Sequence, residues 1–297
     1  MEGKDLQLSL IGVPTNSAGN GGGVASAPAA LRRAGLAKAL GRLSDVRDEG
    51  DVTFSKPSTR RDSESGIIAH DSLVSMIHNV RASVDGVLQS GRFPLVIGGD
   101  CPVLLGCLAA CKGIHVGLLF VDGHEDAYPA HKSPTGEAAD MELGFALGLE
   151  VQEKIQEAVG SPLIDAARVC ILGARDKKVL QKMGIRSLDG LVEYHDDAEL
   201  RAGSIPALTS RVLRRLTSKT GKLWLHIDLD VLSTRSLPAV DYRQPGGLSW
   251  KQLEELAKAI LSSGNVVGCN VTIYNPDLDP NRRHAKRIVK FLSAVLA

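Results

Sequence analysis

Short apolar runs alternate with longer amphipathic stretches along the chain. Residues 6–13 (LQLSLIGV), 93–97 (FPLVI) and 115–121 (HVGLLFV) have the length and composition of buried strands. Residues 70–90 instead carry apolar side chains at helical spacing, namely Leu73, Ile77, Val80, Val84 and Leu88. This alternation is typical of βαβ units, so it predicts an α/β protein with a mostly parallel sheet.

The same criteria predict the other elements. Further strands are expected at residues 168–172, 222–230 and 266–274. Helices are expected at 27–40, 103–112, 250–261 and 284–296, the first with Pro28 near its start. Polar stretches without periodicity predict loops at 55–65, 127–140 and 233–247. We see no internal repeat and no interdomain linker, so a single domain is predicted over residues 1–297.

Composition and charge exclude several classes of protein. The chain has 297 residues, with 35 Lys and Arg against 34 Asp and Glu, so its formal net charge is +1. This balance argues against a nucleic-acid partner or an acidic membrane surface, which normally select a basic excess. No apolar run reaches the roughly 20 residues that span a bilayer, so no membrane partner is expected.

The cysteines and the N-terminus indicate the compartment. Five cysteines are an odd number in a large chain, which makes a disulfide scaffold improbable and favours a reducing environment. The N-terminal residues MEGKDLQLSLIGVP include two acids and only a short apolar run, unlike a secretory signal. We therefore expect a cytoplasmic protein.

Acidic residues follow three of the predicted strands, at the point where each strand ends. They are Asp100 beside Cys101, then Asp122, His124 and Asp126, and finally Asp228 and Asp230. Because the carboxyl ends of parallel strands form a ligand crevice, these three strand ends are expected to converge on one site. Asp228 and Asp230 are two apart on the predicted strand 222–230, which places both on one face together with His226.

Carboxylates packed this closely repel one another, and burial increases the free-energy cost. A lone Asp-X-Asp pair often only caps a loop, but acids directly after a run as apolar as 115–121 indicate chemistry. Two divalent cations would relieve the repulsion, and together they lower the pKa of a shared water molecule. The sequence therefore predicts a dinuclear metal site.

Six short motifs follow one another along nearly the whole chain. They are GGV…APAALRRAGL at 22–36, GGDC at 98–101, DGHED at 122–126, HIDLD at 226–230, PGGLS at 245–249 and Asn275-Pro276. In order and spacing they resemble the GGV…GP..LR..GL, GGDH, DAHxD, SxDxD, PGGL(S/T) and NP motifs of the arginase–agmatinase ureohydrolase superfamily.

This resemblance implies a three-layer α/β/α fold with a dinuclear manganese centre in a homo-oligomer. Carried over by position, one ion is held by Cys101, Asp122, Asp126 and Asp228, and the other by His124, Asp122, Asp228 and Asp230. The implied reaction hydrolyses a C–N bond of a small guanidino or related amidine substrate by attack of a metal-bridging hydroxide, usually with release of urea. Asp126 is then expected in the catalytic set as well as among the ligands.

Cys101 departs from the resemblance, because the family has a metal-ligating His at this place. A thiolate is a softer ligand than an imidazole, so Zn²⁺, Fe²⁺ or Ni²⁺ compete with Mn²⁺ as the native ion. The alternative is that Cys101 does not bind metal and that one metal position is weak.

The loop after the DGHED motif departs as well. Residues 133–136 match the family's SxxG, but Ala139 falls where the family has a proton-shuttle His. Proton transfer would then fall to His226, His131 or Glu137. His226 has an equally good alternative role, as a buried hydrogen-bonding partner of the metal ligands.

Ile273 stands where the family has a Glu that pairs with the substrate guanidinium. Loss of a buried ion partner costs about 3–5 kcal/mol. Either the substrate is less basic, such as an N-hydroxyguanidine or an acylated guanidine, or Glu137 or Asp241 makes the contact instead. The residues predicted to bind substrate are His131, Ser133, Asp241, Arg243 and Tyr274, with Arg243 a candidate for a substrate carboxylate.

Other function classes stay open at this stage. A metal-dependent amidohydrolase would use the same site on an amide, and a catalytically silent relative would bind metal without turnover. A nucleotide-binding protein is suggested only by the glycines at 19–23, which match neither GxGxxG nor GxxxxGK.

Overall fold

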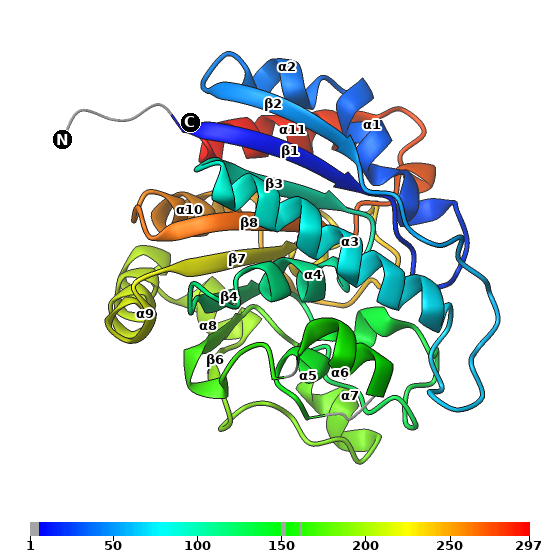
Figure 1. Cartoon of the computed structure of the whole chain (residues 1–297). Coiled ribbons are helices and arrows are strands. Elements are labelled where there is room, and N and C mark those ends of the chain that lie inside the picture. The colour runs from blue at the N-terminus through cyan, green and yellow to red at the C-terminus, as the bar shows by residue number, and fades with distance from the viewer. Residues whose placement is uncertain (1–5, 150–152, 161) are drawn as a thin grey trace.

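Eight strands form one sheet in the computed structural model, which describes residues 6–149, 153–160 and 162–297 (Figure 1). Residues 1–5 of the predicted non-secretory N-terminus lie outside the described residues. The strands are β1 (Gln7–Val13), β2 (Asp45–Asp51), β3 (Phe93–Gly98), β4 (Gly117–Val121), β5 (Val169–Leu172), β6 (Glu193–His195), β7 (Leu223–Asp228) and β8 (Val266–Thr272). Their order is β2-β1-β3-β8-β7-β4-β5-β6, and every neighbouring pair is parallel, so the predicted parallel sheet is confirmed.

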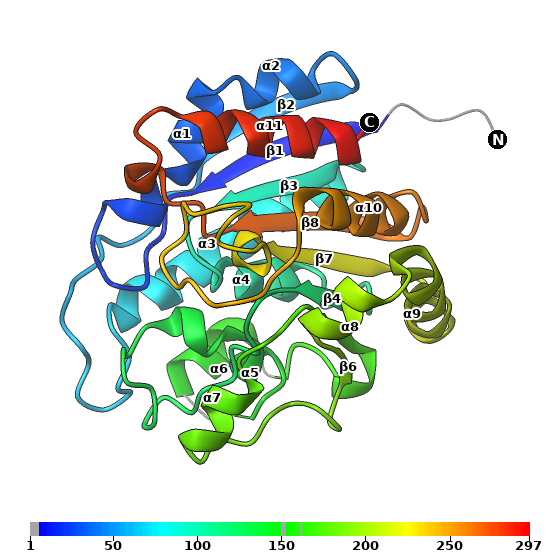
Figure 2. The same cartoon turned by 180° about the vertical axis from the view of Figure 1, so that it is seen from behind.

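Helices cover both faces of this sheet, which confirms the predicted three-layer fold (Figures 1 and 2). One face is covered by α3 (His70–Gln89), α4 (Val103–Ala110), α5 (Glu142–Ala146) and α6 (Glu153–Val159). The other is covered by α1 (Ala27–Arg33), α2 (Leu36–Leu40), α9 (Ile205–Thr220), α10 (Trp250–Leu261) and α11 (Arg283–Val295). The short helices α7 (Lys177–Lys182) and α8 (Asp197–Ala202) lie between β5 and α9 in the chain.

The central strands are apolar throughout because both of their faces are buried. In β4, Leu118 and Phe120 belong to the hydrophobic core beneath α3 and α4, whereas Leu119 and Val121 belong to the core beneath α9 and α10. Continuous apolar runs of this kind are typical of parallel strands with helices on both sides.

The structure differs from the predicted elements in several places. The helix expected at 27–40 is two helices, since Gly35 adopts a left-handed conformation (φ 91°) between α1 and α2. The edge strands β2 and β6 were not predicted. The sequence of β2, DVRDEGD, is charged and largely exposed, as suits an edge strand, and it has no apolar alternation to detect.

The strand predicted at 222–230 ends early, at Asp228. The carboxylate of Asp228 accepts a hydrogen bond from the Asp230 amide at 2.6 Å, and this contact turns residues Leu229–Val231 into a 3-10 helix. Asp228 and Asp230 therefore do not share a strand face as expected. Asp230 approaches the site from the turn instead.

Strand order places the predicted site residues side by side. Strands β3 and β4 are separated in the sheet by β8 and β7, and all four end at the same edge. Cys101 follows β3, Thr272 ends β8, Asp228 ends β7 and Asp122 follows β4. Among the described residues, no helix is both long and apolar enough to cross a membrane.

Candidate functional site

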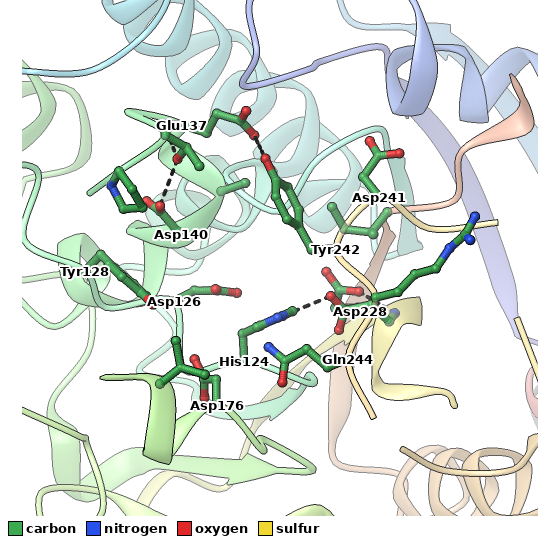
Figure 3. Close-up of a pocket in the computed structure, with 17 residues that line it drawn as sticks. His124, Asp126, Tyr128, Glu137, Asp140, Asp176, Asp228, Asp241, Tyr242 and Gln244 are labelled. Atoms are coloured by element: carbon green, nitrogen blue, oxygen red, sulfur yellow. Dashed lines mark hydrogen bonds and ion pairs between the residues drawn. The ribbon is translucent and has the colours of Figure 1, made fainter. Parts of the chain in front are cut away.

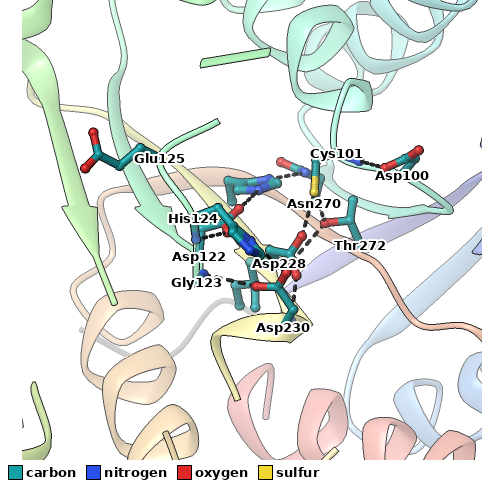
Figure 4. A network of polar contacts seen from close by, with 12 residues as sticks. Asp100, Cys101, Asp122, Gly123, His124, Glu125, Asp228, Asp230, Asn270 and Thr272 are labelled. Atoms are coloured by element: carbon teal, nitrogen blue, oxygen red, sulfur yellow. Dashed lines mark hydrogen bonds and ion pairs between the residues drawn. The ribbon is translucent and has the colours of Figure 1, made fainter. Parts of the chain in front are cut away.

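Cys101 lies at the bottom of the site, 1% exposed. Its Sγ atom lies 2.7 Å from Oδ2 of Asp228 and 3.0 Å from Oγ1 of Thr272 (Figure 4). The turn that carries it requires glycine, because a Cβ atom at Gly99 would lie 2.0 Å from the carbonyl oxygen of Thr15. Burial and the Asp228 carboxylate raise the pKa of the Cys101 thiol well above its usual value. A thiol held in this way becomes a thiolate only with a compensating cation.

Asp122, His124 and Asp230 form a second group beside the thiol (Figure 4). Oδ1 of Asp122 accepts a hydrogen bond from the His124 amide at 2.7 Å, and Nδ1 of His124 lies 2.9 Å from Oδ2 of Asp230. The other Asp230 oxygen accepts a hydrogen bond from the Gly123 amide at 3.1 Å. These contacts fix both carboxylates with oxygens close to one another, as a shared cation requires.

A chain of buried hydrogen bonds fixes the orientation of His226. The Trp224 indole donates to Oδ1 of Asn270 at 2.8 Å, so the Asn270 amide group must donate to Nδ1 of His226, at 2.6 Å. An Nδ1 that accepts a hydrogen bond leaves the proton of the neutral ring on Nε2. Nε2 lies 3.4 Å from Oδ2 of Asp122. This geometry turns Nε2 toward Asp122, and His226 does not line the cavity, so it does not support His226 as a proton donor to substrate.

Asp126 and Glu142 complete the buried cluster. Asp126 is 5% exposed and has a left-handed backbone (φ 43°), and Glu142 is completely buried at the start of α5. Neither carboxylate oxygen of Glu142 has a hydrogen-bond partner among the described residues. Burial, followed by the Asp122 charge, raises the pKa of Glu142, and burial, followed by Glu142, raises that of Asp126. Glu142 was missed from the sequence, although an acid between Met141 and Leu143 in an apolar segment was a usable signal.

The cluster fits a metal centre. Ligand atoms of Cys101, Asp122, Glu142 and His226 all lie within 4.8 Å of one another, as do those of Asp122, His124 and Asp230. Oδ2 of Asp122 and Nε2 of His226 are buried without a hydrogen-bond partner among the described residues. Burial and then Asp230 raise the pKa of Asp228. Buried, mutually repelling carboxylates with free oxygens are the donor set that divalent cations stabilise.

A cavity of about 440 Å³ opens above this cluster (Figure 3). Seven carboxylates line it, Asp126, Glu137, Asp140, Asp176, Asp228, Asp230 and Asp241, together with the cationic Arg243. Burial raises the pKa of Asp140 to about 6 and that of Asp176 to about 7. Asp176 was missed although it follows the predicted strand 168–172, where the strand-end argument applied equally. The wall of the cavity is strongly acidic, which suits a cationic ligand.

Not all predicted substrate-binding residues line this cavity. Asp241 and Arg243 line it, and so does Glu137, whose Oε2 accepts a hydrogen bond from the Tyr242 hydroxyl at 2.9 Å. The others do not. His131 is exposed outside the cavity, Ser133 is buried with its hydroxyl donating to Asp140 at 2.8 Å, and the Tyr274 hydroxyl donates to Asp279 at 2.8 Å.

Comparisons with known proteins agree with this geometry. The Arginase family model matches residues 6–297. Arginase from Bacillus caldovelox is 28% identical over 298 residues, which is 97% of each chain. Its solved structure superposes with a TM-score of 0.87 over 99% of both chains. Formimidoylglutamase from Bacillus subtilis has the same fold, with a TM-score of 0.75 at 18% identity over 100% of this chain and 88% of the other.

The family match extends across the sheet, the buried cluster and the cavity. The elements that carry Cys101, Asp122 and Asp228 thus belong to the matched region. The chain therefore belongs to the arginase family, whose members are metal-dependent hydrolases of C–N bonds in linear amidines.

Proposed function

We propose that this enzyme hydrolyses a C–N bond in a cationic guanidino-type substrate and releases urea or a urea derivative. The observation that carries the proposal is the cavity above the buried Cys, His and Asp cluster, whose wall holds four acids outside the proposed ligand set, Glu137, Asp140, Asp176 and Asp241. An acidic cavity of this kind concentrates cations and disfavours anionic ligands.

Two divalent ions are the cofactors of this proposal. By the family pattern, Cys101, Asp122, Asp126 and Asp228 would hold one, and His124, Asp122, Asp228 and Asp230 the other. Divalent ions bound here would activate a water molecule at neutral pH and stabilise the negative charge that develops during its attack. Mn²⁺ is the first candidate, and the Cys101 thiol supports Zn²⁺, Fe²⁺ or Ni²⁺ as alternatives.

Asp241, beside Ile273, supplies the negative charge that this apolar side chain lacks. Glu137, Asp241 and Ile273 line both the main cavity and the smaller one that adjoins it. Asp241 accepts a hydrogen bond from Asn275, which orients its carboxylate. A guanidinium that enters between these side chains meets at least one carboxylate and forms charge-assisted hydrogen bonds with it.

Glu137 is the proton donor that the geometry supports best. Ala139, where the family has its His, also lines the cavity, but its methyl group carries no proton. His226 is buried behind the cluster and His131 is exposed outside the cavity. Burial raises the pKa of Glu137, and the Tyr242 hydroxyl holds its carboxyl group in place. A carboxyl group that keeps its proton longer than usual is better suited to protonate a leaving amine.

The proposal is tested by product analysis. The metal-loaded enzyme is offered arginine, agmatine, N-hydroxyguanidines, N-formimidoylglutamate and simple amides, and urea, hydroxyurea and ammonia are measured. We expect turnover of a guanidino compound and a loss of at least about 10³-fold in Asp230→Ala, since a metal ligand and its charge are removed. Asp189→Ala, which removes an exposed carboxylate paired with Lys177, is the matched control and should retain activity.

A different product pattern identifies the alternatives. Turnover of amides alone would support an amidohydrolase, which the apolar side chain of Ile273 in the cavity wall favours. Full metal loading without turnover on this panel would contradict the proposal and support a silent metal-binding relative.

We also propose a cytoplasmic homo-oligomer. All five cysteines are free and buried, which suits a reducing compartment. Light scattering of the purified protein tests the assembly.

A further inference from the structure

We propose that Glu142 is an additional ligand of the metal ion on the Cys101 side of the site. This inference rests on the proposed dinuclear centre and adds to it a residue that is not among the ligands given by the family pattern. The geometry supports it, since carboxylate oxygens of Glu142 and Asp122 and the sulfur of Cys101 lie within 4.8 Å of one another.

The surroundings of Glu142 leave few other roles. Its side chain is 0% exposed and its two oxygens have no hydrogen-bond partner among the described residues. The ionisable groups that face it are themselves acidic: Asp122 and then Asp100 repel its negative charge most strongly, and the Asp126 side chain lies against it. A buried carboxylate in such surroundings stays ionised only beside a cation.

Glu142 is also placed for a metal rather than for the substrate. It does not line the cavity, whereas Asp126 and Asp228 do. It is completely buried at the first turn of α5. A ligand outside the cavity wall leaves the cavity side of the ion open.

The fourth member of the group, His226, does not compete for this role. The Trp224–Asn270–His226 hydrogen bonds place the neutral ring's proton on Nε2, the nitrogen that faces Asp122. A protonated nitrogen does not bind a metal ion. On this side, Cys101 therefore replaces a ligand of the family pattern, and Glu142 is a ligand in addition to it. A thiolate among carboxylates shifts the preference of the site from Mn²⁺ toward Zn²⁺, Fe²⁺ or Co²⁺.

The test measures metal binding rather than activity. Metal-free wild-type protein, Glu142→Gln and Cys101→Ser are titrated with Co²⁺, and the thiolate-to-cobalt charge-transfer band reports the ion beside Cys101. We expect the band to vanish in Cys101→Ser. In Glu142→Gln it should form with affinity weakened by about tenfold or more. An unchanged titration of Glu142→Gln would overturn the inference.

Control variants exclude a different cluster. Ligand atoms of Cys170, Glu193 and His195 also lie close together, but Glu193 is paired with Arg215 and His195. Cys170→Ser and Glu193→Gln should leave the cobalt band and the metal content unchanged. Loss of the band in these variants would place the ion beside Cys170 and Glu193 and would overturn the inference.

Thermal unfolding gives a second signature that a merely structural role does not produce. The Tm of the wild type and of Glu142→Gln is first measured without metal, as the reference for each protein. With metal, the increase in Tm should be smaller than in the wild type, because the folded state binds the ion less tightly. Equal increases in both proteins would contradict the inference.

A crystal of wild-type protein soaked with Zn²⁺ covers the case in which the variants do not fold. Anomalous scattering should place an ion about 2.0–2.2 Å from a Glu142 oxygen. An ion beside Cys101 but out of contact with Glu142 would refute the inference. Protein that binds metal through Glu142 but hydrolyses nothing on the substrate panel would instead refute only the proposed guanidino hydrolysis.

Discussion

At the scale of single residues, we expect the Cys101 thiol to set the metal selectivity of the site. It contacts the Asp228 carboxylate and the Thr272 hydroxyl, and it shares its surroundings with Glu142 and Asp122. Since an imidazole is a harder ligand than a thiolate, Cys101→His should shift the ratio of Mn²⁺ to Zn²⁺ affinity toward Mn²⁺, on the order of tenfold. Competition dialysis with metal analysis measures that ratio.

Cys170→Ser is the control for that prediction, because it removes another buried thiol outside the proposed centre. The same ratio in wild-type protein and Cys101→His would show that the thiol does not contact the ion.

Residue types at strand ends were predictable, but their exact partners were not. Asp122, His124 and Cys101 could be placed at one edge because parallel strands end together. Glu142 could not, since it lies on the short helix α5, whose position depends on packing against α4 and α6. His131 and Tyr274 were predicted to bind substrate, but neither lines the cavity, and the Tyr274 hydroxyl donates to Asp279 instead.

At the scale of elements, hydrogen bonds between strands hold the centre in place. Trp224 and His226 on β7 both bond to Asn270 on β8, and all three side chains are completely buried. Asn270→Leu would leave an indole N–H and an imidazole nitrogen unpaired, which costs about 1–3 kcal/mol for each group. We expect the free energy of unfolding to fall by about 2–6 kcal/mol in urea titrations at equal metal loading.

Asn79→Ala is a suitable control for this element, because the exposed Asn79 side chain on α3 only donates to the Thr53 carbonyl. Its effect should lie within about 1 kcal/mol. An Asn270→Leu variant as stable as this control would show that the Trp224–Asn270–His226 hydrogen bonds are not needed to hold β7 against β8.

Elements were predictable where burial imposes a pattern. The run in β4 is apolar because helices cover both of its faces, and α3 carries a stripe because one of its faces is buried. Strand β2 was not predicted because its side chains are charged and exposed at an edge. The turn at Asp230 was not predicted because it depends on a single hydrogen bond from the Asp230 amide to Asp228, which ends β7.

The acidic centre couples stability to pH at the scale of the whole molecule. Burial raises the pKa of Asp126 and Glu142, that of Asp140 to about 6 and that of Asp176 to about 7. Each group binds its proton more tightly in the folded chain, so its stabilisation is complete below the unfolded pKa of about 4 and is lost as the pH rises through the folded value. The pKa of Asp122 is lowered instead, so its ionised carboxylate stabilises the folded chain and this contribution is lost only under acidic conditions.

Metal-free protein should therefore show a Tm that falls between about pH 5 and about pH 8. Metal-loaded protein should lose less, because the ions compensate the carboxylates once these are ionised. Scanning calorimetry in chelator and in excess metal compares the two curves. A metal-free Tm that rises over this range would contradict the burial of these groups as neutral acids.

The central position of β8 has a consequence for the order of folding. This strand is the last of the eight along the chain, yet it lies between β3 and β7 and joins the two halves of the sheet. While the polypeptide is being synthesised, the two strands that lie between β3 and β4 in the finished sheet, β8 and β7, have not yet been made. Cys101 therefore cannot approach Asp228 until β7 and β8 have emerged. Contacts so distant in sequence form slowly. The acidic cluster is thus assembled at a late step, after most of the hydrophobic core is available to hold it.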